Sequence, residues 1–397
     1  MSLHFARFCA RLLLPFLSLL LVACSGHRPP PEGFDEAALK YRAAGYQPAT
    51  KRSTREWQAT WALNQSLLDV AWVAPQPGAS AAPLILYLPG LGEPARGGEL
   101  WRRAWAEAGY AVLSLQMPDD GRAVYSSAEA QAGAFRALAQ KHFSPAALQA
   151  RLNAVRLALA EVRRRAQAGD PAFAGVDTSR LLVAGFDLGA QTAAALAGER
   201  DAGEQPALSP APLAAILLSP YVEAQRDPAR FARIAAPLLS ITGPQDEDPL
   251  SWQPALQRQA LWAGVQVPGS YQLLAQAGHL SLSGSAPERH AGKRDEEGGR
   301  GPGGPGMGGP PPSLAYGDEG GERRGDDRRG GPGGRQGPRG FGAGERIDYR
   351  QVAAIQAVSL AFLDASVRGS IPAQQWLQQA APSWLGRQAT LQVRPLP

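Results

Sequence analysis

The 397-residue chain has a formal net charge of +5, is 44% hydrophobic and contains two cysteines, Cys9 and Cys24. Both cysteines lie near the N-terminus, so the body of the chain has no disulfide framework, thiolate zinc site or cysteine nucleophile. Its arginines are scattered among carboxylates, whereas nucleic-acid-binding proteins concentrate basic residues on one face, so we expect no nucleic-acid partner. The length and composition allow one large domain with its own core.

Residues 1–23 have the pattern of an export signal. Two arginines precede an apolar run over residues 12–22, which is shorter than the roughly 20 residues needed to span a bilayer. The run ends in Leu21-Val22-Ala23-Cys24, which resembles the lipobox of bacterial lipoproteins. That resemblance implies a lipid anchor on Cys24 and, from Ser25, a place in the bacterial outer membrane facing the periplasm. An ordinary signal peptide with an incidental cysteine is the alternative.

Two further segments fall outside the predicted fold. Residues 24–33 contain three consecutive prolines and are expected to form an extended tether. Residues 287–346 are rich in Gly, Pro, Arg, Asp and Glu, cannot bury enough apolar area to offset chain entropy, and are predicted to be a disordered insertion. Helical spacing of apolar residues resumes after the insertion. One domain is therefore predicted from residues 34–286 together with 347–397.

Apolar runs and helical patterns alternate along this domain, which predicts an α/β fold. We expect a mostly parallel eight-stranded sheet with helices on both faces and no large cap. In chain order, the predicted strands are 56–63, 67–74, 84–88, 111–115, 181–184, 215–218, 238–241 and 271–274, and the predicted helices are 35–45, 99–107, 145–166, 188–198, 254–262 and 347–366.

The sequence Gly185-Phe186-Asp187-Leu188-Gly189 stands between a predicted strand and an Ala-rich helix. Small residues at both ends let the strand and helix pack closely, which pushes the middle residue out of the turn. This is the pattern of a nucleophile elbow, G-x-S-x-G, with Asp187 where serine is usual. No other stretch of the chain matches G-x-S-x-G.

Two more polar groups follow strands of the predicted sheet, where the active sites of such sheets lie. Asp246 follows strand 238–241, with Asp248 as a second candidate for the same role, and His279 follows strand 271–274. The chain order nucleophile, acid, histidine is that of α/β-hydrolases. The other histidines are set aside by their positions: His4 in the signal, His27 in the tether, His290 in the insertion and His142 at the start of a helix with no strand before it.

On these residues the chain resembles α/β-hydrolases of the dienelactone-hydrolase or small bacterial esterase type, over residues 55–286 and 347–380. The segment Leu88-Pro89-Gly90-Leu91-Gly92 matches the oxyanion loop of that family, with Pro89 where histidine is common. The resemblance implies a hydrolase without a cofactor that acts on an ester or related small molecule. By position, it assigns Asp187 as nucleophile, Asp246 as acid, His279 as base, and the backbone N–H groups of Leu91 and Leu188 as the oxyanion hole.

Asp187 leaves more than one function open. Haloalkane dehalogenases and epoxide hydrolases use an elbow aspartate to displace a leaving group at a saturated carbon. They usually carry a helical cap, whereas the corresponding interval here, Tyr221 to Ala236, is short, and no obvious halide-binding tryptophan follows Asp187. The alternative is a catalytically degenerate lipoprotein of the same fold with a binding or structural role. Substrate identity, protein partners and oligomeric state stay open.

Two patterns in the sequence imitate cofactor sites, but we expect neither to bind a cofactor. Gly90 to Ala95 imitates a dinucleotide fingerprint, but its prolines fit poorly in a turn that must open into a helix. The group Asp187, Asp246, Asp248 and His279 contains one histidine and three carboxylates, which is more often a hydrolase site than a metal site.

Overall fold

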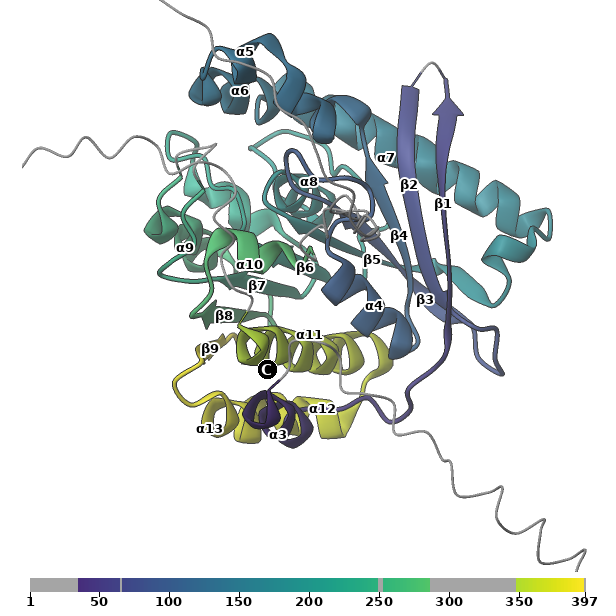
Figure 1. Ribbon diagram of the computed structural model, residues 1–397, viewed down its shortest axis with the longest axis vertical. Helices are drawn as coiled ribbons and strands as arrows, with labels where there is room; N and C mark the ends of the chain where they lie inside the picture. Colours follow the sequence, from purple (N-terminus) through teal and green to yellow (C-terminus); the bar gives the residue numbers. More distant parts are fainter. Residues whose placement is uncertain (1–34, 65, 249–252, 286–347, 396–397) are drawn as a thin grey trace, which may run out of the picture. The chain divides into compact units, whose positions relative to one another are not determined.

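The computed structural model describes residues 35–64, 66–248, 253–285 and 348–395 (Figure 1). The predicted signal, Cys24, the tether and the insertion lie outside the described residues. The described segments before and after residues 287–346 belong to one compact unit. Within the described residues, no helix combines the length and apolar character that crossing a bilayer requires.

The centre of the fold is a nine-stranded sheet in the order β1-β2-β4-β3-β5-β6-β7-β8-β9. The pairs from β4 across to β8 are parallel, whereas β1–β2, β2–β4 and β8–β9 are antiparallel. The strands are β1 Thr54–Leu63, β2 Ser66–Pro75, β3 Ala82–Leu88, β4 Ala111–Gln116, β5 Val176–Phe186, β6 Ala215–Leu218, β7 Leu238–Thr242, β8 Tyr271–Ala275 and β9 Ala389–Val393.

All eight predicted strands are present, but the predicted count of eight is wrong. The ninth strand, β9, pairs with β8 through the register Leu273 to Leu391. It forms the edge of the sheet and is mostly exposed or half-buried, so it lacks the continuous apolar run of the inner strands.

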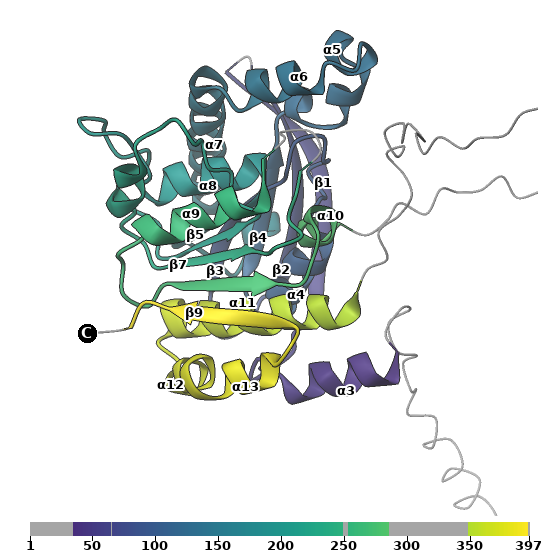
Figure 2. The same cartoon turned by 90° about the vertical axis from the view of Figure 1, so that its left-hand side faces the viewer.

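Helices cover both faces of the sheet (Figures 1 and 2). On one face lie α7, α8 and α9, and on the other lie α4 and α11, with α3, α12 and α13 packed outside α11. The helices are α3 Glu36–Ala44, α4 Glu99–Glu107, α5 Ala128–Gln131, α6 Phe135–His142, α7 Pro145–Gln167, α8 Leu188–Ala197, α9 Ala255–Gly264, α10 His279–Ser283, α11 Tyr349–Arg368, α12 Ile371–Gln375 and α13 Ala381–Leu385.

Alternate side chains of the inner strands enter two separate cores, as the pleat of a strand requires. In β3, Leu84 and Leu86 pack toward α7 and α8, whereas Ile85 and Tyr87 pack toward α4 and α11. Because both faces of β3 are buried, its sequence is apolar throughout, which is why it was predictable from composition alone.

The segment between β4 and α7 was not predicted. It contains two short 3-10 helices, Pro118–Asp120 and Arg122–Ser126, followed by α5 and α6. His142 is the last residue of α6, so its predicted position at a helix start is wrong. These elements bring Val124, Leu138 and Phe143 against Leu91 and Leu188 in a small apolar cluster, so the segment covers the loops that carry the candidate site.

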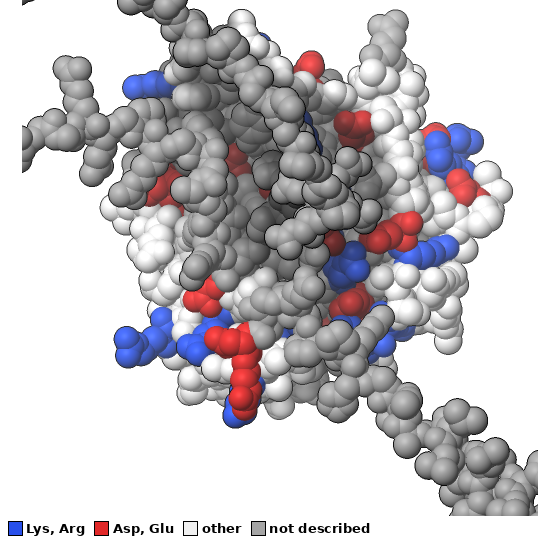
Figure 3. Space-filling model, viewed as in Figure 1, with Lys and Arg blue, Asp and Glu red and all other residues white. Residues whose placement is uncertain are grey.

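Charged side chains of both signs are interspersed over the described surface on the face shown in Figure 3.

Candidate functional site

Asp187 stands at the turn between β5 and α8, with backbone angles of φ 50° and ψ −110°. A positive φ is rare for a residue with a side chain and costs about 1–3 kcal/mol, so the surrounding structure must hold it. The neighbouring glycines show how. A Cβ at Gly185 would overlap the backbone of Gly189, and one at Gly189 would overlap the carbonyl oxygen of Leu88. Strand, turn and helix therefore meet as closely as the elbow pattern predicts.

His279 and Asp246 meet beside this turn, at the ends of two strands. His279 begins α10 after β8, and its Nδ1 lies 2.9 Å from Oδ1 of Asp246, which follows β7. The imidazole packs against the ring of Phe186, with centroids 4.8 Å apart. Because a carboxylate only accepts hydrogen bonds, Nδ1–H donates to Asp246 and Nε2 is left for chemistry.

The structure separates the two candidate acids. Asp246 contacts Nδ1 of His279, whereas Oδ1 of Asp248 lies 3.9 Å from Nε2, on the other side of the ring. Asp246 is fully buried, and its Oδ2 also accepts a 2.7 Å hydrogen bond from the hydroxyl of Thr242. Asp246 therefore lies on the side of the ring where an orienting acid would stand, whereas Asp248 faces the same space as Asp187.

Arg258, which no sequence pattern predicted, is a fully buried residue of α9 that lies beside Asp187 and Asp246. Its Nη1 is 3.8 Å from Oδ1 of Asp187, and its Nε is 3.5 Å from Oδ1 of Asp246. Nη1 also donates a 2.9 Å hydrogen bond to the carbonyl of Ser219. One positive charge thus offsets part of the negative charge that the aspartates bring into the interior.

Ser219 is the second residue that sequence reasoning missed. It follows β6 directly with φ 49°, and its hydroxyl lies 2.7 Å from Oδ1 of Asp246 and 2.9 Å from Nδ1 of His279. It therefore helps to fix the imidazole relative to the acid. Its position in the sequence could have indicated this role, because Ser219 directly follows the predicted strand 215–218.

Buried charges shift the titration of the site. Burial and the nearby Asp248 raise the pKa of Asp187 to about 6, although His279, Arg258 and the N–H of Leu188 oppose the rise. Burial works against ionisation of Asp246, but its hydrogen bond with His279 and the charge of Arg258 outweigh it and lower its pKa. For His279, burial disfavours the charged form, yet the hydrogen bond to Asp246 and the charge of Asp187 raise the pKa.

The predicted oxyanion loop lies against the elbow. A Cβ at Gly90 would come within 2.6 Å of the Phe186 ring, and the N–H of Leu188 is close enough to Asp187 to stabilise its charge. The side chains of Leu91 and Leu188 share the small apolar cluster described above. The two residues that the resemblance assigns to the oxyanion hole are therefore neighbours in space.

A buried polar network holds the predicted oxyanion loop, residues 88–92, in place. The N–H of Gly92 donates to the carbonyl of Asp120 at 2.8 Å, and the Asp120 carboxylate lies 2.6 Å from Nδ1 of His142. Arg151 then donates to the carbonyl of His142 and to the side chain of Gln191, one turn into α8. His142 is thus a structural residue that connects the oxyanion loop with the elbow helix.

The geometry argues against the dinucleotide turn, but it brings together three of the four side chains of the possible metal site. The N–H groups of Gly90 and Gly92 already donate to Glu93 and Asp120, and α4 begins only at Glu99, so the turn does not present them to a pyrophosphate. Among the described residues, one group could gather donor atoms around a metal ion, all within 4.8 Å of one another: Asp187, Asp248 and His279. The guanidinium of Arg258 beside Asp187 disfavours a cation there.

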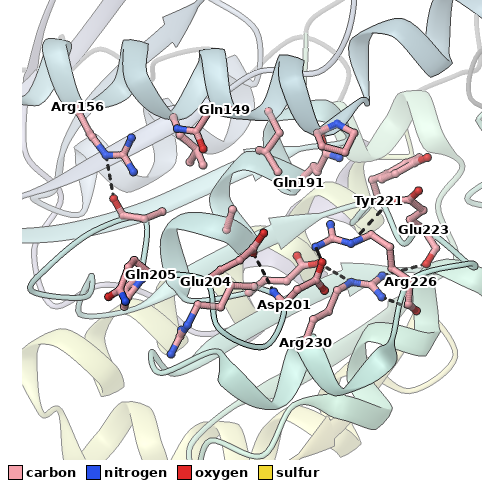
Figure 4. Close-up of a pocket in the computed structure, with 18 residues that line it drawn as sticks. Gln149, Arg156, Gln191, Asp201, Glu204, Gln205, Tyr221, Glu223, Arg226 and Arg230 are labelled. Atoms are coloured by element: carbon pink, nitrogen blue, oxygen red, sulfur yellow. Dashed lines mark hydrogen bonds and ion pairs between the residues drawn. The ribbon is translucent and has the colours of Figure 1, made fainter.

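A separate cavity of about 430 Å³ lies between α7, α8 and the segment after α8 (Figure 4). Its charges are largely paired within the wall: Arg230 donates to Glu199 at 2.7 Å, and Arg226 donates to Asp201 at 2.8 Å. Tyr221 lies at the end of this cavity and stacks on Phe143. The cavity is lined by none of the three predicted catalytic side chains.

Comparison with known protein families and with curated protein sequences finds no match.

Proposed function

We propose that the protein is a hydrolase of the α/β-hydrolase fold in which Asp187 is the nucleophile and His279, oriented by Asp246, is the base. The carboxylate attacks a carbon that bears a leaving group and forms an ester with the substrate. Displacement at a saturated carbon suits a carboxylate, because attack on a carboxylic ester gives an unstable anhydride. The substrate is a small molecule, and the reaction needs no cofactor.

The observation that carries the proposal is the strained backbone of Asp187 beside the His279–Asp246 pair. The strained turn directs one buried side chain to the carboxyl edge of the sheet, and two further strand ends supply the base and its orienting acid. A residue that served packing alone would gain nothing from this conformation, whereas strained residues gather at active sites.

The residues divide the reaction into two steps. In the first, Asp187 forms a bond to the substrate carbon and the leaving group departs with its electron pair. In the second, Nε2 of His279 accepts a proton from water, and the oxygen attacks the ester carbon of Asp187. The negative charge on the tetrahedral intermediate is stabilised by the N–H groups of Leu91 and Leu188, and the alcohol leaves with the proton from His279.

A degenerate, ligand-binding protein is the second candidate. It is favoured by the ion pair between Asp187 and Arg258 and by the depth of Asp187, which is 3% exposed. In that case the carboxylate has taken a structural role in an inherited fold.

Trapping the ester on Asp187 tests the proposal. Changing His279 to Gln removes the base of the second step, so incubation with 1-bromobutane or 1,2-epoxybutane is expected to leave a stable adduct visible by intact mass. Peptide mapping should place the adduct on Asp187. The double variant Asp187→Asn/His279→Gln is the matched control, because it lacks the carboxylate that forms the ester and should gain no mass. Absence of an adduct from every compound, with the variant folded, contradicts the nucleophile.

Asp187→Ser tests the degenerate alternative. The change rebuilds a Ser-His-Asp triad on the same backbone, so a fluorophosphonate probe should label the variant and not the natural protein. Labelling without any adduct in the His279→Gln experiment supports an inherited site that no longer turns over substrate.

We also propose that this hydrolase is anchored to the bacterial outer membrane through lipid on Cys24. The support is the lipobox-like segment that ends at Cys24.

A further inference from the structure

The cavity between α7, α8 and the segment after α8 lies outside the proposed reaction, because none of the three catalytic side chains lines it. Its volume of about 430 Å³ falls within the roughly 300–1,000 Å³ of small-molecule sites. Leu148, Leu152 and Ala195 contribute apolar surface to its wall, and polar side chains from the other elements face them (Figure 4). The wall therefore offers a ligand both apolar contact and hydrogen bonds.

The charged side chains of this wall, when ionised, sum to zero. Four arginines and four carboxylates line the cavity: Arg156, Arg200, Arg226, Arg230, Glu199, Asp201, Glu204 and Glu223. Arg230 is 2% exposed and donates to Glu199, and Arg226 donates to Asp201. An anionic ligand would have to displace these carboxylates from their arginines, and a cationic ligand would meet an arginine beside each carboxylate. The pairing favours an uncharged ligand.

Three of the carboxylates use only one of their oxygens within the protein. Oε1 of Glu199 and Oδ2 of Asp201 accept from their arginines, and Oε2 of Glu204 accepts a 3.0 Å hydrogen bond from the N–H of Asp201. In the part of the chain that the structure describes, the second oxygen of each accepts no hydrogen bond. Because a carboxylate oxygen only accepts, a ligand that matches this wall carries several hydroxyl donors.

Tyr221 adds an aromatic ring at one end of the cavity (Figure 4). It stacks on Phe143 with ring centroids 4.2 Å apart and an angle of 25° between the rings, which fixes its orientation. The negative face and positive edge of an aromatic ring favour specific contacts with the C–H groups of a ligand. A pyranose ring presents such C–H groups between its hydroxyls.

We propose that this cavity binds a neutral pyranose sugar, at a site separate from Asp187 and independent of the proposed hydrolysis. The hydroxyls of the sugar donate to the second oxygens of Glu199, Asp201 and Glu204, and its C–H groups pack against Tyr221. Binding makes and breaks no covalent bond.

The first test measures binding of the neutral hexoses glucose, galactose and mannose to the full-length protein, by saturation-transfer difference NMR and titration calorimetry. The hexose that binds most tightly is then compared with its uronic acid and its 2-amino sugar, which keep the ring and add one charge. Each charged sugar should bind at least about tenfold more weakly, because the charges of the wall are already paired.

The second test changes the wall. Tyr221→Ala should weaken binding of the same hexose about tenfold or more, whereas Tyr221→Phe keeps the ring and should retain most of the affinity. Tyr125→Ala is the matched control, because it removes a tyrosine ring outside the cavity and should leave the affinity unchanged. Ala195→Leu enlarges a side chain of the wall and leaves its polar groups in place, so it should also weaken binding, whether or not Tyr221→Ala folds.

Absence of binding by every neutral hexose at concentrations up to about 10 mM overturns the proposal. A charged sugar that binds as tightly as its neutral counterpart, or more tightly, overturns it as well. Binding that neither Tyr221→Ala nor Ala195→Leu weakens shows that the sugar is held elsewhere, which overturns the site. None of these measurements involves Asp187 or His279, so their outcome is independent of the proposed hydrolase.

Discussion

Replacing Asp187 with Asn should stabilise the protein, because the folded state raises the pKa of this carboxyl from 3.8 to about 6. The folded protein binds the proton of Asp187 more tightly than the unfolded chain does. Ionisation of Asp187 therefore lowers the free energy of unfolding, by little below pH 3.8 and by an amount that grows until about pH 6. At about 1.4 kcal/mol per pKa unit, the ionised form costs about 3 kcal/mol above pH 6. Asparagine keeps the shape and removes the charge.

Urea unfolding monitored by tryptophan fluorescence measures this effect at intervals between pH 4 and 8. The unfolding free energy of Asp187→Asn minus that of the natural protein should be near zero at pH 4 and reach about 3 kcal/mol by pH 7.5. Asp177→Asn is the control with the opposite sign, because the Ser179 hydroxyl lowers the pKa of Asp177. A difference that does not change with pH, or a less stable Asp187→Asn protein at pH 7.5, would refute the electrostatic account of the site.

Three further outcomes are expected. Changing Cys24 to Ser should abolish incorporation of labelled palmitate and release the protein from membranes, and unchanged labelling would exclude the lipid anchor. Deleting residues 290–343 should move the midpoint of thermal unfolding by no more than a few degrees, since loop closure changes by about 0.6 kcal/mol per halving of length; loss of a cooperative transition would show that the segment is structural. Arg258→Met should lower the unfolding free energy by about 3–5 kcal/mol at pH 7.5, because it leaves two buried carboxylates uncompensated, and adding Asp187→Asn should restore part of the loss; full additivity of the two changes would contradict their coupling.

The fold was predictable wherever burial dictates composition. β3, β4 and β6 are buried on every residue, and their sequences are apolar apart from Ser114 and Gln116 of β4. Edge strand β9 was missed, since three of its five residues are exposed and such positions accept polar residues. The segment over residues 118–142 was missed for a related reason: its helices are short, and its buried apolar side chains form a small cluster with Leu91 and Leu188.

The positions of the three predicted site residues at strand ends could be predicted from the sequence, whereas the buried charge beside them could not. Asp187, Asp246 and His279 could be found because each follows a strand of the sheet, and parallel strands bring their carboxyl ends together. Arg258 lies in α9, whose sequence has the pattern of an amphipathic helix, and an arginine in such a helix is ordinarily exposed to solvent. Its burial depends on where α9 packs, which no local pattern encodes. The different positions of Asp246 and Asp248 around one ring also required coordinates.

The last described residue before the insertion is attached to the oxyanion loop. The hydroxyl of Ser285 donates to Glu93 at 2.6 Å and accepts from the N–H of Gly98 at 3.0 Å, while Glu93 itself holds the N–H of Gly90. An insertion made near Ser285 therefore affects the oxyanion loop as well. A reporter or affinity tag inserted after residue 290 leaves the hydrogen bonds of Ser285 intact. A junction at Ser285 removes its hydrogen bond to Glu93, which lies two residues from Leu91 in the oxyanion loop.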